Sequence, residues 1–358
     1  MRPITATISL DALRHNLGVV RRCAPRSRVF AVIKANAYGH GAARVARALH
    51  GADGIALLEL DAAVRLREAG ERRRLALLEG LFDATELATA AAHHLTIAIH
   101  GQDQLRMLDS APHDARFDVM LKINTGMNRL GFTPPDARAA WETLKNHRAV
   151  EQVTLMTHFA TADDARGVAW QLEVLNEIAA EVTGGLQCER STANSAAVLR
   201  HPETHADWVR PGIMLYGCSP FADMTAEALG LTPAMTLTSA VISVQELRAG
   251  DRIGYAGTFE AAQGMRVGTV ACGYADGYPR HAPTGTPVLV GGQRTRTLGR
   301  VSMDMLCVDL SAIPAAGVGA TVTLWGAGLS ADEVATHAGT VSYELLCAVA
   351  PRVAIREI

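Results

Sequence analysis

The chain has 358 residues, of which 49% are hydrophobic and 20% are charged, and its 34 Lys and Arg nearly balance 36 Asp and Glu, which leaves a formal net charge of -2. This composition is typical of a globular protein with two domains, and without a sustained basic run it excludes the phosphate-binding surface of a nucleic-acid-binding protein. No apolar run approaches the ~18 residues of a membrane span, and the N-terminus reaches Asp11 without the apolar region of a secretion signal. We therefore expect a cytoplasmic protein with neither a nucleic-acid nor a membrane partner.

The six cysteines are scattered along the chain and form no C-x-x-C pair. This spacing indicates neither a zinc ribbon nor a disulfide framework. We expect free thiols in a reducing cytosol and no metal.

Apolar runs rich in branched residues recur through the first part of the chain, and amphipathic stretches such as Glu59–Ala69 and Asp136–Asn146 separate most of them. Strand alternating with helix at repeats of roughly 20–35 residues indicates βα units and a parallel sheet. About eight such units in about 220 residues favour a closed (β/α)8 barrel over an open doubly wound sheet, although periodicity alone does not decide between them. The expected strands are Arg28–Ile33, Gly54–Leu58, Leu75–Glu79, Leu95–Ile99, Phe117–Ile123, Val153–Met156 and Trp208–Arg210.

The pattern changes near residues 221–230. Beyond them, short runs alternate apolar and polar residues between glycine-bearing turns, which is typical of β-strands. Only Ser330–Ala338 is expected to be helical, with Ser330 as its N-cap and Glu333 completing a capping box. The sequence thus predicts an α/β barrel domain over residues 1–228 and a mostly β domain over residues 229–358. The expected strands of the second domain are Leu237–Glu246, Arg266–Ala271, Thr286–Val290, Met305–Leu310 and Thr321–Trp325.

Active sites of (β/α)8 barrels lie at the C-terminal ends of the strands, so polar residues that directly follow apolar runs are the candidates. Lys34 stands out because apolar and small residues flank it. A desolvated lysine amine loses proton affinity and becomes a nucleophile for carbonyl compounds, whereas a lone lysine at a strand end is more often simply solvated. The candidates at this rim are Lys34, Lys122, Arg129, His158, Asn194, Ser195 and Arg210.

Eight segments spread over nearly the whole chain carry a family resemblance. They are Lys34–Gly41, Lys122–Gly131, Met156–Ala160, Ala193–Ser195, Arg210–Gly217, Ile253–Tyr255, Gly273–Gly277 and Gly299–Asp304. In this order they resemble the successive motifs of the alanine racemase family. The resemblance implies an enzyme that interconverts L- and D-alanine with pyridoxal 5'-phosphate (PLP), for peptidoglycan synthesis or for alanine catabolism.

The resemblance also implies two bases. Lys34 is implied to carry PLP on its amine and to act on one face of the α-carbon, and Tyr255, from the β domain of the other subunit of a homodimer, is implied to act on the opposite face. An unaided phenol with a pKa near ~10 is a poor base at neutral pH, so cationic neighbours must favour the phenolate. Arg129 is implied to lie near that hydroxyl and the substrate carboxylate.

The remaining cofactor contacts follow from the same motifs. Arg210 is implied to face the pyridine nitrogen, which a guanidinium leaves unprotonated and hence less electron-withdrawing than a carboxylate partner does. His158 is implied to stack on the cofactor ring. Hydroxyls and backbone N–H groups hold a phosphate well. The implied phosphate and neighbouring cofactor contacts are Tyr38, Asn194, Ser195, Gly212, Ile213 and Tyr343.

Lys122 is an unusual member, because a cation there forms a like-charge pair with Arg129. In several family members the equivalent lysine is carbamylated, which replaces the positive charge with a negative one that orients the arginine, and we expect this modification here. The resemblance further implies that Met303 contacts the substrate carboxylate in the partner's site and that an access channel is formed by Asp163, Tyr274 and Arg300. Two positions depart from some relatives: Ser191, where some have histidine, and Ser302, where some have cysteine.

Two other protein classes share parts of this pattern. PLP-binding carrier proteins have a similar lysine-bearing barrel but lack a β domain, so residues 231–358 argue against them. Barrel-plus-β-domain decarboxylases place a carboxylate where Arg210 lies. A racemase with a broader amino-acid range stays open, because pocket volume is not readable from the sequence.

Overall fold

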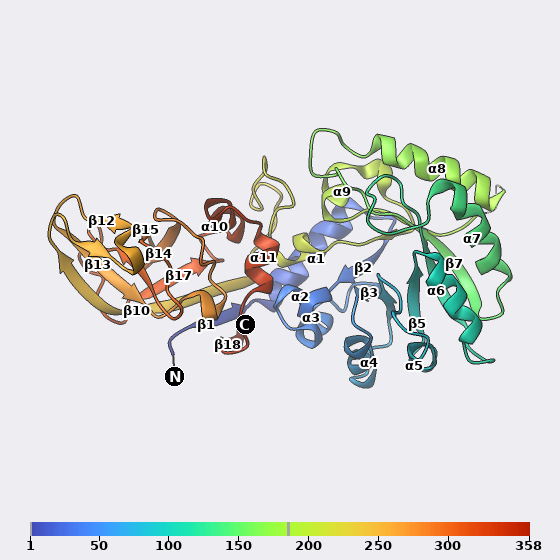
Figure 1. Ribbon diagram of the computed structural model, residues 1–358, viewed down its shortest axis with the longest axis horizontal. Coiled ribbons are helices and arrows are strands. Elements are labelled where there is room, and N and C mark those ends of the chain that lie inside the picture. Colours follow the sequence, from blue (N-terminus) through green and yellow to red (C-terminus); the bar gives the residue numbers. More distant parts are fainter. Residues whose placement is uncertain (1, 185–186) are drawn as a thin grey trace.

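Eight parallel strands close into a barrel, which forms the right-hand domain in Figure 1. The strands follow one another in chain order and the last pairs with the first, while helices cover the outside, so most strand residues are buried. The predicted (β/α)8 fold is thus confirmed. The computed structural model describes residues 2–184 and 187–358. The barrel strands are β2 (Arg28–Val32), β3 (Gly54–Leu57), β4 (Arg74–Leu77), β5 (Leu95–Ile99), β6 (Phe117–Lys122), β7 (Val150–Met156), β8 (Arg190–Ser191) and β9 (Trp208–Val209).

Strand β8 is the barrel strand that the sequence pattern does not locate. It has only two residues, so it shows no period, and its place is set by pairing with β7 and β9. The side chains of Ser9 and Asn194 cap the helices α1 and α9, as short polar side chains do at helix starts. The helices of this domain are α1 (Leu10–Cys23), α3 (Ala42–Ala48), α4 (Leu60–Glu68), α5 (Glu86–Ala92), α6 (Gln102–Met107), α7 (Pro134–Asn146), α8 (Ala169–Thr183) and α9 (Ser195–Arg200).

The segment α2 (Lys34–Tyr38), directly after β2, contains a left-handed turn, because its last four residues have φ between 50° and 56°. Left-handed backbone costs a non-glycine residue roughly 1–2 kcal/mol, so surrounding contacts must hold the turn. Nδ1 of the buried His40 donates to the carbonyls of Tyr38 at 2.8 Å and Ala37 at 3.1 Å, and the Asn36 side chain accepts from the first N–H of α3 at 2.9 Å. Burial lowers the pKa of His40 to about 4, so a neutral imidazole holds the carbonyls of this turn at physiological pH.

The C-terminal domain, on the left in Figure 1, is built on eight strands in the order β13-β16-β15-β14-β17-β10-β1-β18. The long strand β10 also pairs with β13, so the sheet curls around its own hydrophobic residues. Strand β1 precedes the barrel in sequence, yet it pairs with β10 and β18 of the C-terminal sheet. The domain boundary after residue 228 stays a prediction. These strands are β1 (Thr5–Ile8), β10 (Met235–Leu247), β13 (Met265–Val270), β14 (Pro287–Val290), β15 (Gln293–Leu298), β16 (Leu306–Asp309), β17 (Thr321–Trp325) and β18 (Ala354–Glu357).

Two helices accompany this sheet, so the expectation of a single helix is wrong. Helix α10 (Ala331–Ala338) begins at Ser330, whose side chain accepts from the N–H of Glu333, but the Glu333 carboxylate pairs with Arg294 instead of completing the capping box. Helix α11 (Ser342–Cys347) has six residues, too few to show a helical period, and it packs against α2 of the barrel domain. Among the described residues, no helix is long and apolar enough to cross a membrane.

Candidate active site

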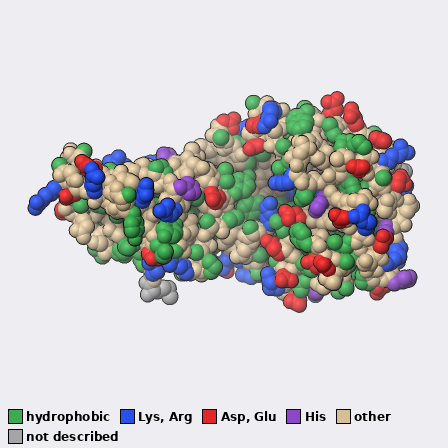
Figure 2. All heavy atoms as spheres, in the orientation of Figure 1, with side chains coloured by type: hydrophobic (Ala, Val, Ile, Leu, Met, Phe, Trp, Pro, Cys, Tyr) green, Lys and Arg blue, Asp and Glu red, His purple; other side chains and the backbone are tan. Residues whose placement is uncertain are grey.

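A cavity of about 400 Å³ opens at the C-terminal ends of the barrel strands, on the rim where the sequence predicts the site. Figure 2 shows a hollow on this face between the barrel domain and the C-terminal domain. Helix α11 reaches the cavity, so the C-terminal domain of the same chain also contributes to it. The predicted residues that line the cavity are Lys34, Tyr38, Lys122, Arg129, His158, Asp163, Asn194, Ser195, Arg210, Gly212, Ile213 and Tyr343.

Arg210 directly follows β9 and is buried in the cavity wall. Its guanidinium donates to the Ser191 hydroxyl at 2.8 Å, to the Thr157 carbonyl at 2.6 Å and to the Thr192 carbonyl at 3.3 Å. Burial lowers the pKa of Arg210 to about 10, so the group stays protonated near neutral pH and acts as a fixed donor. Ser191, one of the two departures from the family pattern, is therefore a residue that holds Arg210 in place.

Hydroxyls and backbone N–H groups gather where the turn η3 (Ile213–Tyr216) begins. The Ser195 hydroxyl accepts from the Gly212 N–H at 2.8 Å, and a Cβ atom at Gly212 would lie 2.5 Å from the Tyr38 hydroxyl oxygen. The ring of Tyr343 lies 6.0 Å from that of Tyr38. Burial raises the pKa of both tyrosines, so their phenols remain neutral hydrogen-bond donors. Such a compact set of donors suits a phosphate group.

The cavity is rich in cationic side chains, and they change the protonation of their neighbours. Burial, followed by the charges of Arg210 and Arg129, lowers the pKa of Lys122 to about 8. Burial and the same arginines lower the pKa of His158 to about 3. His158 is therefore a neutral imidazole at physiological pH, which can lie against a flat ring without adding charge.

One acidic residue of the cavity was not among the candidates drawn from the sequence. Glu79 lies just beyond β4, lines the cavity, and its carboxylate partly offsets the lowering of the pKa of Lys122. Glu79 follows an apolar run, as Lys34 does, so the same sequence pattern could have identified Glu79 as a candidate. Within the described ranges, no three His, Cys, Asp or Glu side chains gather to hold a metal. The apolar lining, which a search for polar residues does not find, includes Val32, Leu58, Leu78, Phe159 and Pro220.

Four predicted residues lie on the C-terminal domain and do not line this cavity. Tyr255 is at the tip of a hairpin formed by β11 (Arg252–Ile253) and β12 (Phe259–Glu260), and its side chain is 72% exposed. Strand β12 lies at the end of its domain far from the barrel (Figure 1). Gly254, with φ of 66°, supplies the left-handed conformation that starts this tip. The other three are the exposed residues Met303, Tyr274 and Arg300.

The residues of the cavity fit PLP, the cofactor that the sequence predicts. Lys34 offers an amine to a carbonyl group, Ser195 and Gly212 belong to a donor set that suits a phosphate, and Arg210 offers a donor to a pyridine nitrogen. His158 supplies a neutral flat ring. The volume of about 400 Å³ falls within the range of ~300–1,000 Å³ that small-molecule sites occupy.

Comparison with known proteins places the chain in a family. Residues 8–220 match the family described as "Alanine racemase, N-terminal domain", and residues 234–356 match "Alanine racemase, C-terminal domain". An alanine racemase from Nitrosospira multiformis is 61% identical over 98% of both chains, and a catabolic alanine racemase from Salmonella typhimurium is 53% identical over the same shares. The crystal structure of the biosynthetic alanine racemase from Pseudomonas aeruginosa, 50% identical, matches with a TM-score of 0.96 over the whole of both chains. The chain therefore belongs to the alanine racemase family.

Proposed function

We propose that this chain interconverts L- and D-alanine with PLP, using Lys34 and the partner subunit's Tyr255 as bases on opposite faces of the α-carbon. The observation that carries the proposal is the meeting of Lys34 with Arg210 and a phosphate-type donor set in one cavity. Enzymes of this family depend on PLP. Relatives named as biosynthetic and as catabolic are both similar to the chain, so the proposal covers supply of D-alanine for peptidoglycan and catabolism of alanine.

Residues of the barrel domain hold the cofactor and transfer the proton on one face of the substrate. When bound, PLP supplies an electron sink that makes the α-proton of the amino acid removable. Lys34, fixed at the end of β2 by the left-handed turn, accepts that proton on its own side. Arg210 would hold the pyridine nitrogen as a hydrogen-bond donor and keeps its own proton, because its pKa of about 10 is well above neutral pH. Arg210 thereby favours simple proton return over the side reactions that a stronger electron sink allows.

Inversion needs a second base on the opposite face, and the exposed Tyr255 hairpin supports its supply by another subunit. A large aromatic side chain that is 72% exposed is a candidate for contact with a second protein surface. Arg129 on the cavity wall offers the cation that favours a phenolate. We infer a homodimer in which each hairpin enters the other barrel. On the same domain, Met303 completes the substrate contact, and Tyr274 and Arg300 complete the access channel.

Conversion of L-alanine to D-alanine by the purified, PLP-saturated protein tests the proposal directly. D-amino-acid oxidase coupled to peroxidase reports the D-alanine formed, and parallel reactions with L-serine and L-lysine measure substrate range. We expect turnover of alanine well above that of the other two. An inactive PLP-saturated enzyme would refute the proposed reaction, and equal turnover of all three would replace it with a broad-range racemase.

Mixing two inactive variants tests the shared site. Lys34→Ala chains retain the β domain and Tyr255→Phe chains retain the barrel, so a mixed dimer contains one cavity with both bases intact. Unfolding and refolding the two variants together is expected to restore activity up to about one quarter of the normal level, since half the dimers are mixed and each has one competent cavity. No restored activity in a mixture that contains mixed dimers would show that the site is not shared.

Gly212→Ala is expected to weaken PLP binding by about tenfold or more. The new methyl group would lie 2.5 Å from the Tyr38 hydroxyl and would push this donor out of the phosphate set. A hydrogen bond to a charged group is worth ~1.5–3 kcal/mol, and ~1.4 kcal/mol is a factor of ten in affinity. Titration of the apoenzyme with PLP, followed by absorbance, measures the change. Gly317→Ala is the matched control, because a Cβ atom there meets nothing within 4 Å. Unchanged affinity of Gly212→Ala would remove Gly212 from the phosphate site.

Carbamylation of Lys122 is expected to rise with pH through about 8, the value to which its pKa is lowered. The neutral amine attacks carbon dioxide, forms an N–C bond and releases a proton, and below its pKa the amine is protonated and unreactive. An ordinary lysine with a pKa near ~10.4 would react only at higher pH. In 13C-bicarbonate, the NMR spectrum should gain one carbamate signal that Lys145→Arg keeps and Lys122→Arg loses. A spectrum without that signal at about pH 9 would exclude the modification.

A further inference from the structure

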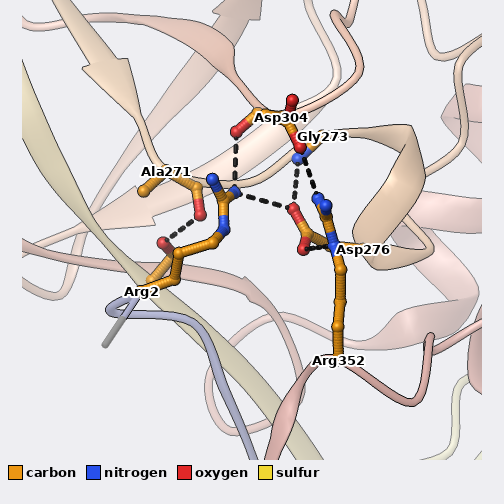
Figure 3. Close-up of polar contacts among 7 residues, drawn as sticks. Arg2, Ala271, Gly273, Asp276, Asp304 and Arg352 are labelled. Carbon is orange, nitrogen blue, oxygen red and sulfur yellow. Dashed lines mark hydrogen bonds and ion pairs between the residues drawn. The ribbon is translucent and has the colours of Figure 1, made fainter.

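A fully buried carboxylate, that of Asp276, lies between two arginines in the C-terminal domain, and Figure 3 shows both arginines pointing toward it. Asp276 accepts hydrogen bonds from Arg2 Nη2 at 3.0 Å, from Arg352 Nε at 2.7 Å and from the Gly273 N–H at 3.0 Å. The two arginines precede β1 and β18, which are neighbouring parallel strands, so both reach the same point. Removing one member of such a buried set leaves the others uncompensated.

The same two arginines also hold the loop that carries Met303. Arg2 Nη2 donates to the backbone carbonyl of Asp304 at 2.9 Å, and Arg352 Nη2 donates to the Asp304 carboxylate at 2.7 Å. Each arginine therefore joins Asp276 to the residue that directly follows Met303 (Figure 3).

The turn that contains Asp276 binds this loop directly as well. This turn, η5 (Tyr274–Asp276), donates from the Tyr274 N–H to the Ser302 carbonyl at 3.1 Å and from the Ala275 N–H to the Met303 carbonyl at 2.9 Å. The turn and the loop thus form one unit, with Asp276 on its buried side and with Tyr274 and Met303 on its exposed side. The side chains of Tyr274 and Met303 are 37% and 53% exposed, so their own packing within the chain fixes them only in part.

We propose that Asp276, held by Arg2 and Arg352, is a positioning residue for the partner subunit's active site, because it fixes the Met303 peptide and the Tyr274 turn that enter that site. The inference rests on the shared site proposed above. Asp276 is buried beneath these loops and acts on substrate only through them. Its loss is expected to raise KM for alanine more than it lowers kcat, because Met303 contacts the substrate carboxylate whereas Lys34 and Tyr255 carry the protons.

The mixed dimers separate this role from a general effect on stability. In a mixed dimer the one competent cavity combines the barrel of the Tyr255→Phe chain with the β domain of the Lys34→Ala chain. Asp276→Asn on the Lys34→Ala chain therefore alters the loops of the competent cavity. We expect KM to rise about tenfold, which is the effect of losing one well-placed hydrogen bond to the substrate. The same substitution on the Tyr255→Phe chain alters only the loops at the inactive cavity, and we expect a change in KM of less than about twofold.

Asp309→Asn on the Lys34→Ala chain is the matched control. It alters another carboxylate of the same domain, at the end of β16, which pairs with Arg296 at 3.2 Å and lies outside the 302–304 loop. We expect KM within about twofold of that of the parent mixture. A KM rise of the same size from Asp309→Asn would overturn the specific role of Asp276.

A milder variant keeps the inference testable if Asp276→Asn does not fold. Arg2→Ala removes one of the two arginine contacts of Asp276, and the buried carboxylate keeps its ion pair with Arg352 at 2.7 Å, so this variant is milder than Asp276→Asn. It should raise KM by about threefold on the Lys34→Ala chain and much less on the Tyr255→Phe chain. If either variant raised KM equally on the Lys34→Ala chain and on the Tyr255→Phe chain, Asp276 and its arginines would have only a structural role, and the inference would be overturned. An inactive parent mixture would instead overturn the shared site itself, and this inference with it.

Discussion

Lys34→Ala is expected to lower kcat/KM for alanine by a factor of about 10⁴ or more and to remove the absorbance band of covalently held PLP. In the proposed mechanism, the substitution removes both the amine that attaches the cofactor and the base on one face of the substrate. The nearest replacement, Lys122, is on β6 and is separately held among arginines, so it does not substitute for an amine at the end of β2. Racemisation assays and the spectrum of PLP-treated, gel-filtered protein give the two readouts.

The lysine content of the chain makes this result easy to interpret. Lys34, Lys122 and Lys145 are the only lysines in the sequence. Borohydride reduction of the holoenzyme followed by peptide mapping is expected to place PLP on Lys34 alone. Lys145→Ala, in an exposed position of α7, is the matched control and should keep both activity and absorbance. Label on Lys122, or full absorbance in Lys34→Ala, would assign the attachment to another residue.

Tyr255→Phe is expected to keep the PLP absorbance and to lose racemisation by a factor of about 10³, within the ~10²–10⁴ that a positioned acid–base group contributes. The hydroxyl is on an exposed hairpin tip, so its removal leaves the cavity of the same chain intact. In the proposed mechanism, Lys34 is still able to remove the α-proton of one enantiomer. Exchange of that proton with deuterium from the solvent should therefore survive, and exchange from the other enantiomer should be lost.

Tyr278→Phe provides the comparison for this variant. Tyr278 is buried in the same domain, and its hydroxyl has no hydrogen-bond partner within the described part of the chain, so its removal costs little. Its activity should stay near normal. If Tyr255→Phe lost the PLP absorbance, or lost exchange from both enantiomers equally, Tyr255 would not be the second base.

The barrel and most of its cavity could be predicted from the sequence, because strands of parallel sheets are short apolar runs that end at a common rim. Lys34 and His158 follow such runs, and the structure places both in one cavity. Glu79 follows one as well and lines the same cavity, but it lies outside the eight family segments. Arg210 could be predicted as a cofactor contact, but its three hydrogen bonds within the protein, including that to Ser191, depend on the tertiary structure.

Other features depend on interactions that no local pattern records. Strand β1 is placed by pairing with β10 and β18, which follow the barrel in the chain. Strand β8 is too short to show the alternation of apolar and polar residues that marks a strand. The left-handed turn after Lys34 runs against the intrinsic preference of alanine, and contacts such as those of His40 impose it. The exposure of Tyr255 is likewise a tertiary result, since an aromatic residue beside strand residues is as often packed as exposed.

The placement of β1 has a consequence for how the chain is made. Thr5 of β1 pairs with Thr238 of β10 and with Ala354 of β18, so its sheet closes only after the barrel and nearly all of the C-terminal domain have been synthesised. Contacts of such sequence separation form slowly, whereas the barrel strands pair mainly with neighbours along the chain. During translation the barrel can therefore fold before β1 finds its place. A nascent chain that ends before Arg352 already holds Lys34 and Arg210 but lacks one of the two arginines that bind Asp276. The loops that we propose enter the partner's site are therefore the last part of the chain to be fixed in place.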